Sequence, residues 1–98
     1  MYFVGEMVDA DLYADVTEHD GDTWNNDVFE LFFKPAESRP GYYEFQVNAK
    51  NTVFDMFLPR RGHVARFRRA DEFHIESKVV LDGTLNEWTD RDKGWSVE

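Results

Sequence analysis

The segment 24–33 joins an acid-rich loop to the most apolar stretch of the chain, and this junction restricts the fold more than any other feature. An extended backbone points successive side chains to opposite sides, so Phe29, Leu31 and Phe33 would share one face and Glu30 the other. The apolar face predicts contact with a core. A glutamate between large apolar residues must face water, meet a partner or bind a ligand, because burying an unpaired carboxylate is costly. We therefore predict a central strand over 26–34.

An antiparallel meander is predicted between residues 27 and 58. Residues 41–48 alternate apolar and polar side chains strictly, and a tight connection at 48–51 leads into a third strand over 52–58. Pro35 and Pro59 end their strands, because proline cannot donate a hydrogen bond to a sheet.

Alternation in the first two strands of this meander defines two faces. The face expected in the core carries Phe29, Leu31, Phe33, Tyr43, Phe45 and Val47. The opposite face carries Glu30, Gln46 and Asn48, and we predict that it is open to water with Trp24 near its edge.

The remainder of the chain also favours β-structure. Strands are expected over 2–8, over 73–81 and from Trp95 onward, with one helical turn around 12–16 and a charged excursion over 82–94. Aromatic residues make up 16% of the sequence, which suits strands better than helices. The predicted fold is an all-β antiparallel sandwich, jelly-roll or immunoglobulin-like, with long loops.

The 98 residues are enough for one domain with a single core. We assign residues 1–98 to that domain. Because the sequence begins and ends inside predicted strands, we expect a fragment of a longer module.

Composition excludes several classes of function. The net charge of −9 argues against nucleic-acid binding, and the absence of cysteine removes disulfides, thiolate metal sites and cysteine catalysis. No apolar run has the length of a membrane span, and no phosphate-binding loop or nucleophile elbow is present. We interpret the basic cluster as a loop that offsets part of the acidic excess rather than a phosphate site; it comprises Arg60, Arg61, Arg66, Arg68 and Arg69.

The acidic stretches suggest calcium, a hard cation that takes oxygen ligands. The segments 20–22 and 90–94 have suggestive aspartate spacing, although neither is an EF-hand. We expect a structural calcium site without assigning its ligands. The three histidines, His19, His63 and His74, have no metal-ligand spacing and predict no metal site.

Trp24, Glu30 and the polar strand face form the constellation that best suits a ligand. A sugar offers an apolar face that stacks on an indole ring and hydroxyls that bond to carboxylates and amides. Trp24 could equally cap the core, and sequence alone leaves both interpretations open. A third interpretation makes Glu30 and Glu44 the acid pair of a glycoside hydrolase.

These residues resemble the family 9 carbohydrate-binding modules. The resemblance covers most of the chain and is most specific over 24–55, where Trp24, Glu30 and the run 41–48 agree in spacing as well as type. It implies a β-sandwich without catalytic activity, attached to secreted polysaccharide-active enzymes. The implied ligands are glucans, xylans or short sugars, and the implied localisation is extracellular or periplasmic.

The resemblance also assigns roles to residues. Trp24 matches the first of two tryptophans that enclose the sugar, and Glu30 matches the glutamate beside it. Gln46 stands where the best-known members place an arginine, while the second tryptophan lies beyond Glu98 in the family. Gln46 is thus expected to bond sugar hydroxyls with Glu30, and Asn48 to extend the polar face. The substitution at Gln46 favours the alternative function, a structural or protein-interaction sandwich that does not bind sugar.

Overall fold

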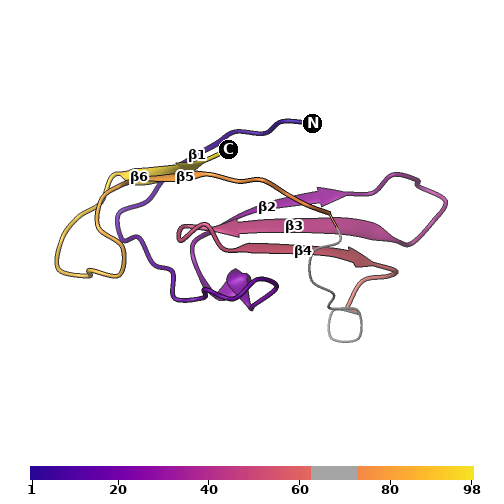
Figure 1. Ribbon diagram of the computed structural model, residues 1–98, viewed down its shortest axis with the longest axis horizontal. Coiled ribbons are helices and arrows are strands. Elements are labelled where there is room, and N and C mark those ends of the chain that lie inside the picture. The colour runs from indigo at the N-terminus through magenta and orange to yellow at the C-terminus, as the bar shows by residue number, and fades with distance from the viewer. Residues whose placement is uncertain (63–72) are drawn as a thin grey trace.

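The computed structural model describes residues 1–62 and 73–98, and this part of the chain is a β-sandwich of two three-stranded antiparallel sheets (Figure 1). The predicted fold class is confirmed. Within these two ranges no helix has the length and hydropathy needed to cross a membrane. The elements are β1 (Gly5–Val8), the 3₁₀ turn η1 (Thr23–Asn25), β2 (Val28–Phe33), β3 (Tyr42–Asn48), β4 (Val53–Leu58), β5 (Val79–Asp82) and β6 (Gly94–Val97).

The larger sheet has the order β2-β3-β4 and is the predicted meander. Its strands are slightly shorter than the sequence suggested, because residues next to the turns leave the ladder. The register places Glu30 opposite Gln46 and Gln46 opposite Phe54. One continuous row of side chains therefore crosses all three strands.

The smaller sheet has the order β1-β6-β5, so its central strand comes from the end of the chain. Figure 1 shows β1 and β6 side by side, with the C-terminus at this sheet and the N-terminal residues running on beyond β1. Gly94 begins β6 with a φ of +149°, and a Cβ there would lie 2.0 Å from the carbonyl oxygen of Met7. Only glycine allows the two strands to approach this closely.

Three predicted elements differ from the structure. The strand expected over 2–8 begins only at Gly5. The strand expected over 73–81 is confined to β5; residues 73–77 alternate in exposure but are not assigned to a strand. The helical turn expected around 12–16 is wrong. Leu12 and Ala14 are fully buried with exposed residues between and beside them, which is the alternation of an extended backbone.

The principal core lies between the two sheets at one end of the larger sheet. It includes Trp95, which is 5% exposed. The buried residues of this cluster are Leu12, Ala14, Val47, Ala49, Trp95 and Val97.

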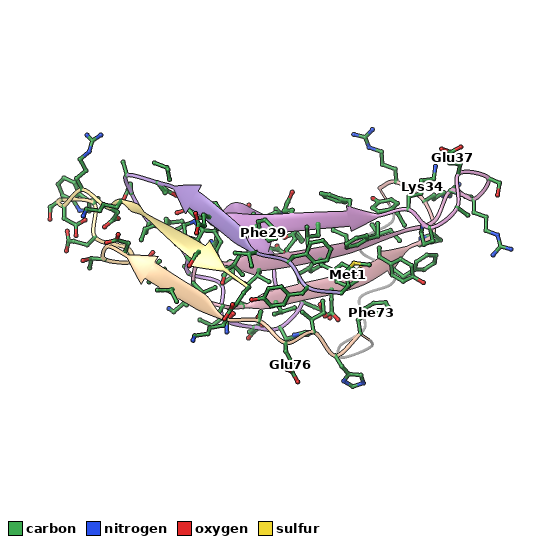
Figure 2. The ribbon with its side chains drawn as sticks, turned by 90° about the horizontal axis from the view of Figure 1, so that it is seen from above. Met1, Phe29, Lys34, Glu37, Phe73 and Glu76 are labelled. Atoms are coloured by element: carbon green, nitrogen blue, oxygen red, sulfur yellow. The ribbon has the colours of Figure 1, made fainter. Side chains whose placement is uncertain are left out.

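The smaller sheet covers only this end, and a cavity of about 1260 Å³ opens over the rest of the inner face. Figure 2 looks onto this region from above, with Met1, Phe29 and Phe73 among the residues that line it. Of the six apolar residues expected in the core, Val47 is buried and the other five are half-buried around the cavity: Phe29, Leu31, Phe33, Tyr43 and Phe45. Their shared face is as predicted, but their burial is less complete.

Candidate functional site

The outer face of the larger sheet, which points away from the smaller sheet, contains most of the predicted site. Its central row runs from Glu30 through Gln46 to Phe54. Glu44 and Met56 lie opposite each other in the adjacent row. Phe54 and Met56 are almost completely buried, although they lie on the face that was expected to be open.

The loop 9–27 accounts for this burial, because it leaves the smaller sheet and passes to the other side of the larger one (Figure 1). The short turn η1 then attaches to the outer face. The hydroxyl of Thr23 donates to Oε1 of Gln46 over 2.6 Å. The ring of Trp24 meets that of Phe54 edge-on, with centroids 5.6 Å apart.

Trp24 caps part of the core and still leaves part of its ring exposed. It packs against Phe54, which is 1% exposed, and thereby caps a small apolar cluster. It also keeps 41% of its own surface exposed. One side of the indole ring thus packs on Phe54, and the exposed part can be reached from solvent.

Gln46 shares its face with Glu30 as predicted, but it does not face water. Its side chain is 1% exposed. The oxygen accepts from Thr23, and the amide donates to Oε1 of Glu44 over 2.6 Å. The expectation of an open face is wrong here because η1 covers Gln46, which now links the loop to Glu44.

Asn48 is likewise covered, with no exposed surface. Its amide donates to the carbonyl oxygen of Val16 and to Oδ1 of Asn26, at 2.9 and 3.0 Å. Its oxygen accepts from the backbone N–H groups of Lys50 and Thr52. Asn48 thus fastens the loop 9–27 to the sheet and shapes the turn after β3.

Two carboxylates remain at the surface of this face. Glu30 is exposed and Glu44 is half-buried. Burial raises the pKa of Glu44 above its ordinary value; the charge of Glu30 raises it further, and the hydrogen bond from Gln46 opposes the change. Both groups are hydrogen-bond acceptors when ionised.

The two segments expected to bind calcium have different structural roles. In 90–94, Asp92 is buried, and its two oxygens accept from the backbone N–H groups of Leu12 and Thr84, each at 2.8 Å. It fastens loops together with both of its oxygens. In 20–22, Asp22 is exposed, whereas Asp20 is buried against β4.

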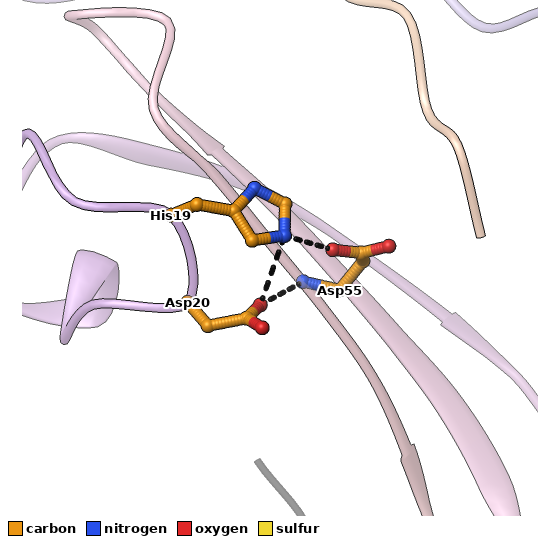
Figure 3. A group of neighbouring side chains, drawn as sticks. All are labelled: His19, Asp20 and Asp55. Carbon is orange, nitrogen blue, oxygen red and sulfur yellow. Dashed lines mark hydrogen bonds and ion pairs between the residues drawn. The ribbon is translucent and has the colours of Figure 1, made fainter. Parts of the chain in front are cut away.

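A group that could hold a metal ion is present among the described residues, formed by His19, Asp20 and Asp55 (Figure 3). Sequence reasoning missed it, because the histidine spacing gave no indication and Asp55 is distant in the chain. One signal was available. Asp55 lies between Phe54 and Met56 in a strand, the same anomaly that singled out Glu30. His63 and the arginines Arg66, Arg68 and Arg69 lie outside the described residues.

No family model matches the chain, and no curated protein or solved structure shows significant similarity to it. The outer face and the sequence resemblance are therefore the basis for a functional proposal.

Proposed function

We propose that this chain is a non-catalytic carbohydrate-binding domain whose ligand lies on the outer face, between Trp24 and the carboxylates of Glu30 and Glu44. The observation that carries the proposal is the position of Trp24. Its ring is 41% exposed, rests on Phe54, and stands at the end of the row that leads through Gln46 to Glu30. An aromatic surface beside hydrogen-bond acceptors matches the two chemical aspects of a sugar.

The structure suggests a division of roles within this face. Trp24 would stack on a sugar ring, and Glu30 and Glu44 would accept hydrogen bonds from its hydroxyls. Gln46 would act indirectly, because its hydrogen bonds hold both Thr23 and Glu44 in place. Asn48 would also act indirectly by fastening the loop that carries Trp24.

The resemblance to family 9 modules supports the same proposal and adds the class of ligand, the role in a parent protein and the localisation. The ligands would be glucans, xylans or the ends of such chains. The domain would direct a parent protein, including a fused catalytic domain, to polysaccharide outside the cell or in the periplasm. Structural calcium belongs to the same set of proposals.

Calorimetric titration of the whole chain with cello- and xylo-oligosaccharides tests the sugar site. We expect saturable binding that Trp24→Ala abolishes and Glu30→Gln weakens, since stacking and hydroxyl contacts would be lost. Trp88→Ala is the matched control, because Trp88 is 82% exposed and belongs to the loop between β5 and β6. Equal affinity in Trp24→Ala and Trp88→Ala would remove the proposed site.

A second candidate function is a protein-interaction sandwich. Phe32 is 57% exposed on the outer face, and its ring lies 6.3 Å from that of Tyr42, so part of this face is apolar. Trp24→Ala would lower stability through lost packing on Phe54 under either candidate, but under this one no oligosaccharide would bind the unaltered chain. The same titrations, with a thermal melt of each variant, distinguish the two candidates.

A further inference from the structure

A second site involves the free edge of β4, where the loop 9–27 passes alongside the strand. The backbone N–H of Asp20 donates to the carbonyl oxygen of Val53 over 3.0 Å. The N–H of Asp55 in turn donates to Oδ1 of Asp20, also over 3.0 Å. Asp20 has a left-handed backbone with a φ of 58°, which aspartate tolerates better than most residues. The loop therefore satisfies groups of an edge strand and delivers two side chains to it.

The three side chains converge there, as Figure 3 shows. Nε2 of His19 lies 2.8 Å from Oδ1 of Asp55 and 3.5 Å from Oδ1 of Asp20. Each residue offers one potential metal-ligand atom, and these three atoms lie within 4.8 Å of one another. His19 is on the solvent side of the group, with 36% of its side chain exposed.

Burial gives the clearest indication that this group suits a cation. Asp55 is 2% exposed and Asp20 is 8% exposed. Within the described ranges, Oδ1 of Asp55 and Oδ2 of Asp20 accept no hydrogen bond, although both atoms are buried. Oδ1 of Asp55 points toward the imidazole of His19, and their 2.8 Å contact is a charge pairing that depends on protonation of His19. Buried carboxylate oxygens in native proteins are normally hydrogen-bonded or coordinate a metal.

We propose that His19, Asp20 and Asp55 bind a divalent transition-metal ion of the zinc class. One imidazole nitrogen and two carboxylate oxygens suit such an ion, whereas calcium takes only oxygen ligands and six to eight of them. Ligands at about 2.1 Å from a tetrahedral ion lie about 3.4 Å apart. The distance of 3.5 Å between His19 and Asp20 agrees with this spacing, and the shorter contact to Asp55 would open slightly. Water would complete the coordination at the exposed side of His19.

Such an ion would link the loop to β4 shortly before Trp24. It would also balance the two carboxylates more completely than one imidazolium can. The competing account is a purely structural ion pair in which protonated His19 bridges Asp20 and Asp55. The two accounts differ in whether added metal occupies the group.

Titration of the chelator-treated, dialysed chain with zinc chloride, followed by calorimetry and thermal melting, tests the proposal. We expect one zinc ion per chain and a higher Tm, while calcium chloride at the same concentration produces neither effect. His19→Ala and Asp55→Asn should each weaken zinc binding by about 100-fold or more. Losing a residue that only supports a metal ligand typically weakens binding about 10- to 100-fold, and losing a ligand itself should cost more. Asp22→Asn, a nearby exposed aspartate, should leave zinc affinity unchanged.

The NMR signals of His19 report zinc binding in a way that does not depend on the stability of the variants. Zinc should shift the NMR signals of one imidazole ring only, that of His19. These signals are identified because they are missing from the spectrum of His19→Ala. His19 is exposed enough that its replacement should leave the fold intact even if Asp55→Asn unfolds. Absence of saturable zinc binding, unchanged affinity in His19→Ala, or calcium binding as tight as zinc would each overturn the proposal.

Discussion

Thr23 donates its hydroxyl hydrogen to Oε1 of Gln46 over 2.6 Å, and both side chains are buried where η1 meets the larger sheet. This bond joins a loop residue to the centre of β3. It also fixes the amide orientation with which Gln46 donates to Glu44. The position of Trp24 and the position of one surface carboxylate therefore depend on the same buried pair.

Replacing Thr23 by valine should lower the free energy of unfolding by about 1 to 3 kcal/mol. Valine keeps the shape of threonine but leaves the buried oxygen of Gln46 without its donor. Thr23→Ser, which keeps the hydroxyl, should lose less. Urea unfolding of the three proteins measures the difference, and a valine variant as stable as the unaltered chain would contradict it.

Asp92→Ala should be among the most destabilising changes outside the apolar core. It removes the acceptor of two backbone N–H groups, those of Leu12 and Thr84, in a buried position. Each unsatisfied group costs about 1 to 3 kcal/mol. Asp90→Ala is the control from the same loop; because Asp90 is exposed, it should change stability by no more than about 0.5 kcal/mol. Similar melting temperatures for the two variants would refute this role of Asp92.

Gly94→Ala should cost about 3 kcal/mol or more, since a strained backbone and a steric collision each cost about 1 to 3 kcal/mol. The added Cβ would lie 2.0 Å from the carbonyl oxygen of Met7 and would force β1 and β6 apart. Gly62→Ala separates the two effects, because Gly62 has a φ of +82° but nothing within 4 Å of the added atom. We expect the control to lose only about 1 to 2 kcal/mol. Equal losses in chemical denaturation would show that the collision is relieved.

The titration of Glu44 should make stability depend on pH. Because burial and the charge of Glu30 hold its pKa above the ordinary value of 4.5, folding favours the protonated carboxyl. This contribution is fully present below pH 4.5 and is lost as the pH rises through the raised pKa. Relative to Glu44→Gln, the unaltered chain should lose Tm across that interval.

NMR titration of the Glu44 carboxyl measures the same effect directly. Its midpoint should lie above 4.5 and should fall in Glu30→Gln, which removes a neighbouring negative charge. A midpoint at or below the ordinary value would show that the hydrogen bond from Gln46 outweighs burial.

Local sequence was sufficient for the larger sheet. Strict alternation over 41–48, with Pro35 after β2 and Pro59 after β4, determined β2, β3 and β4, because a period of two residues belongs to strands alone. The same periodicity placed Glu30 and Gln46 on one face, and the register confirms it. It could not define the full extent of the strand around β5, since pairing depends on a partner that local pattern does not specify.

Burial of that face was decided by tertiary structure. The loop 9–27 has no period that would predict its path, because its aspartates and asparagines form individual hydrogen bonds rather than a repeated ladder. Its path covers Gln46 and Asn48 and leaves Trp24 partly exposed. Sequence thus identified which residues share a face, but not which of them reach solvent.

The group of His19, Asp20 and Asp55 shows the same limit most clearly. The sequence determined that Asp55 is an acidic residue within an apolar strand, which requires a partner. Only the folded chain determined that partner, because the loop 9–27 brings Nε2 of His19 to within 2.8 Å of Oδ1 of Asp55 at the edge of β4. A periodic pattern records the faces of a strand, whereas contacts between a loop and a strand edge arise from the three-dimensional path of the chain.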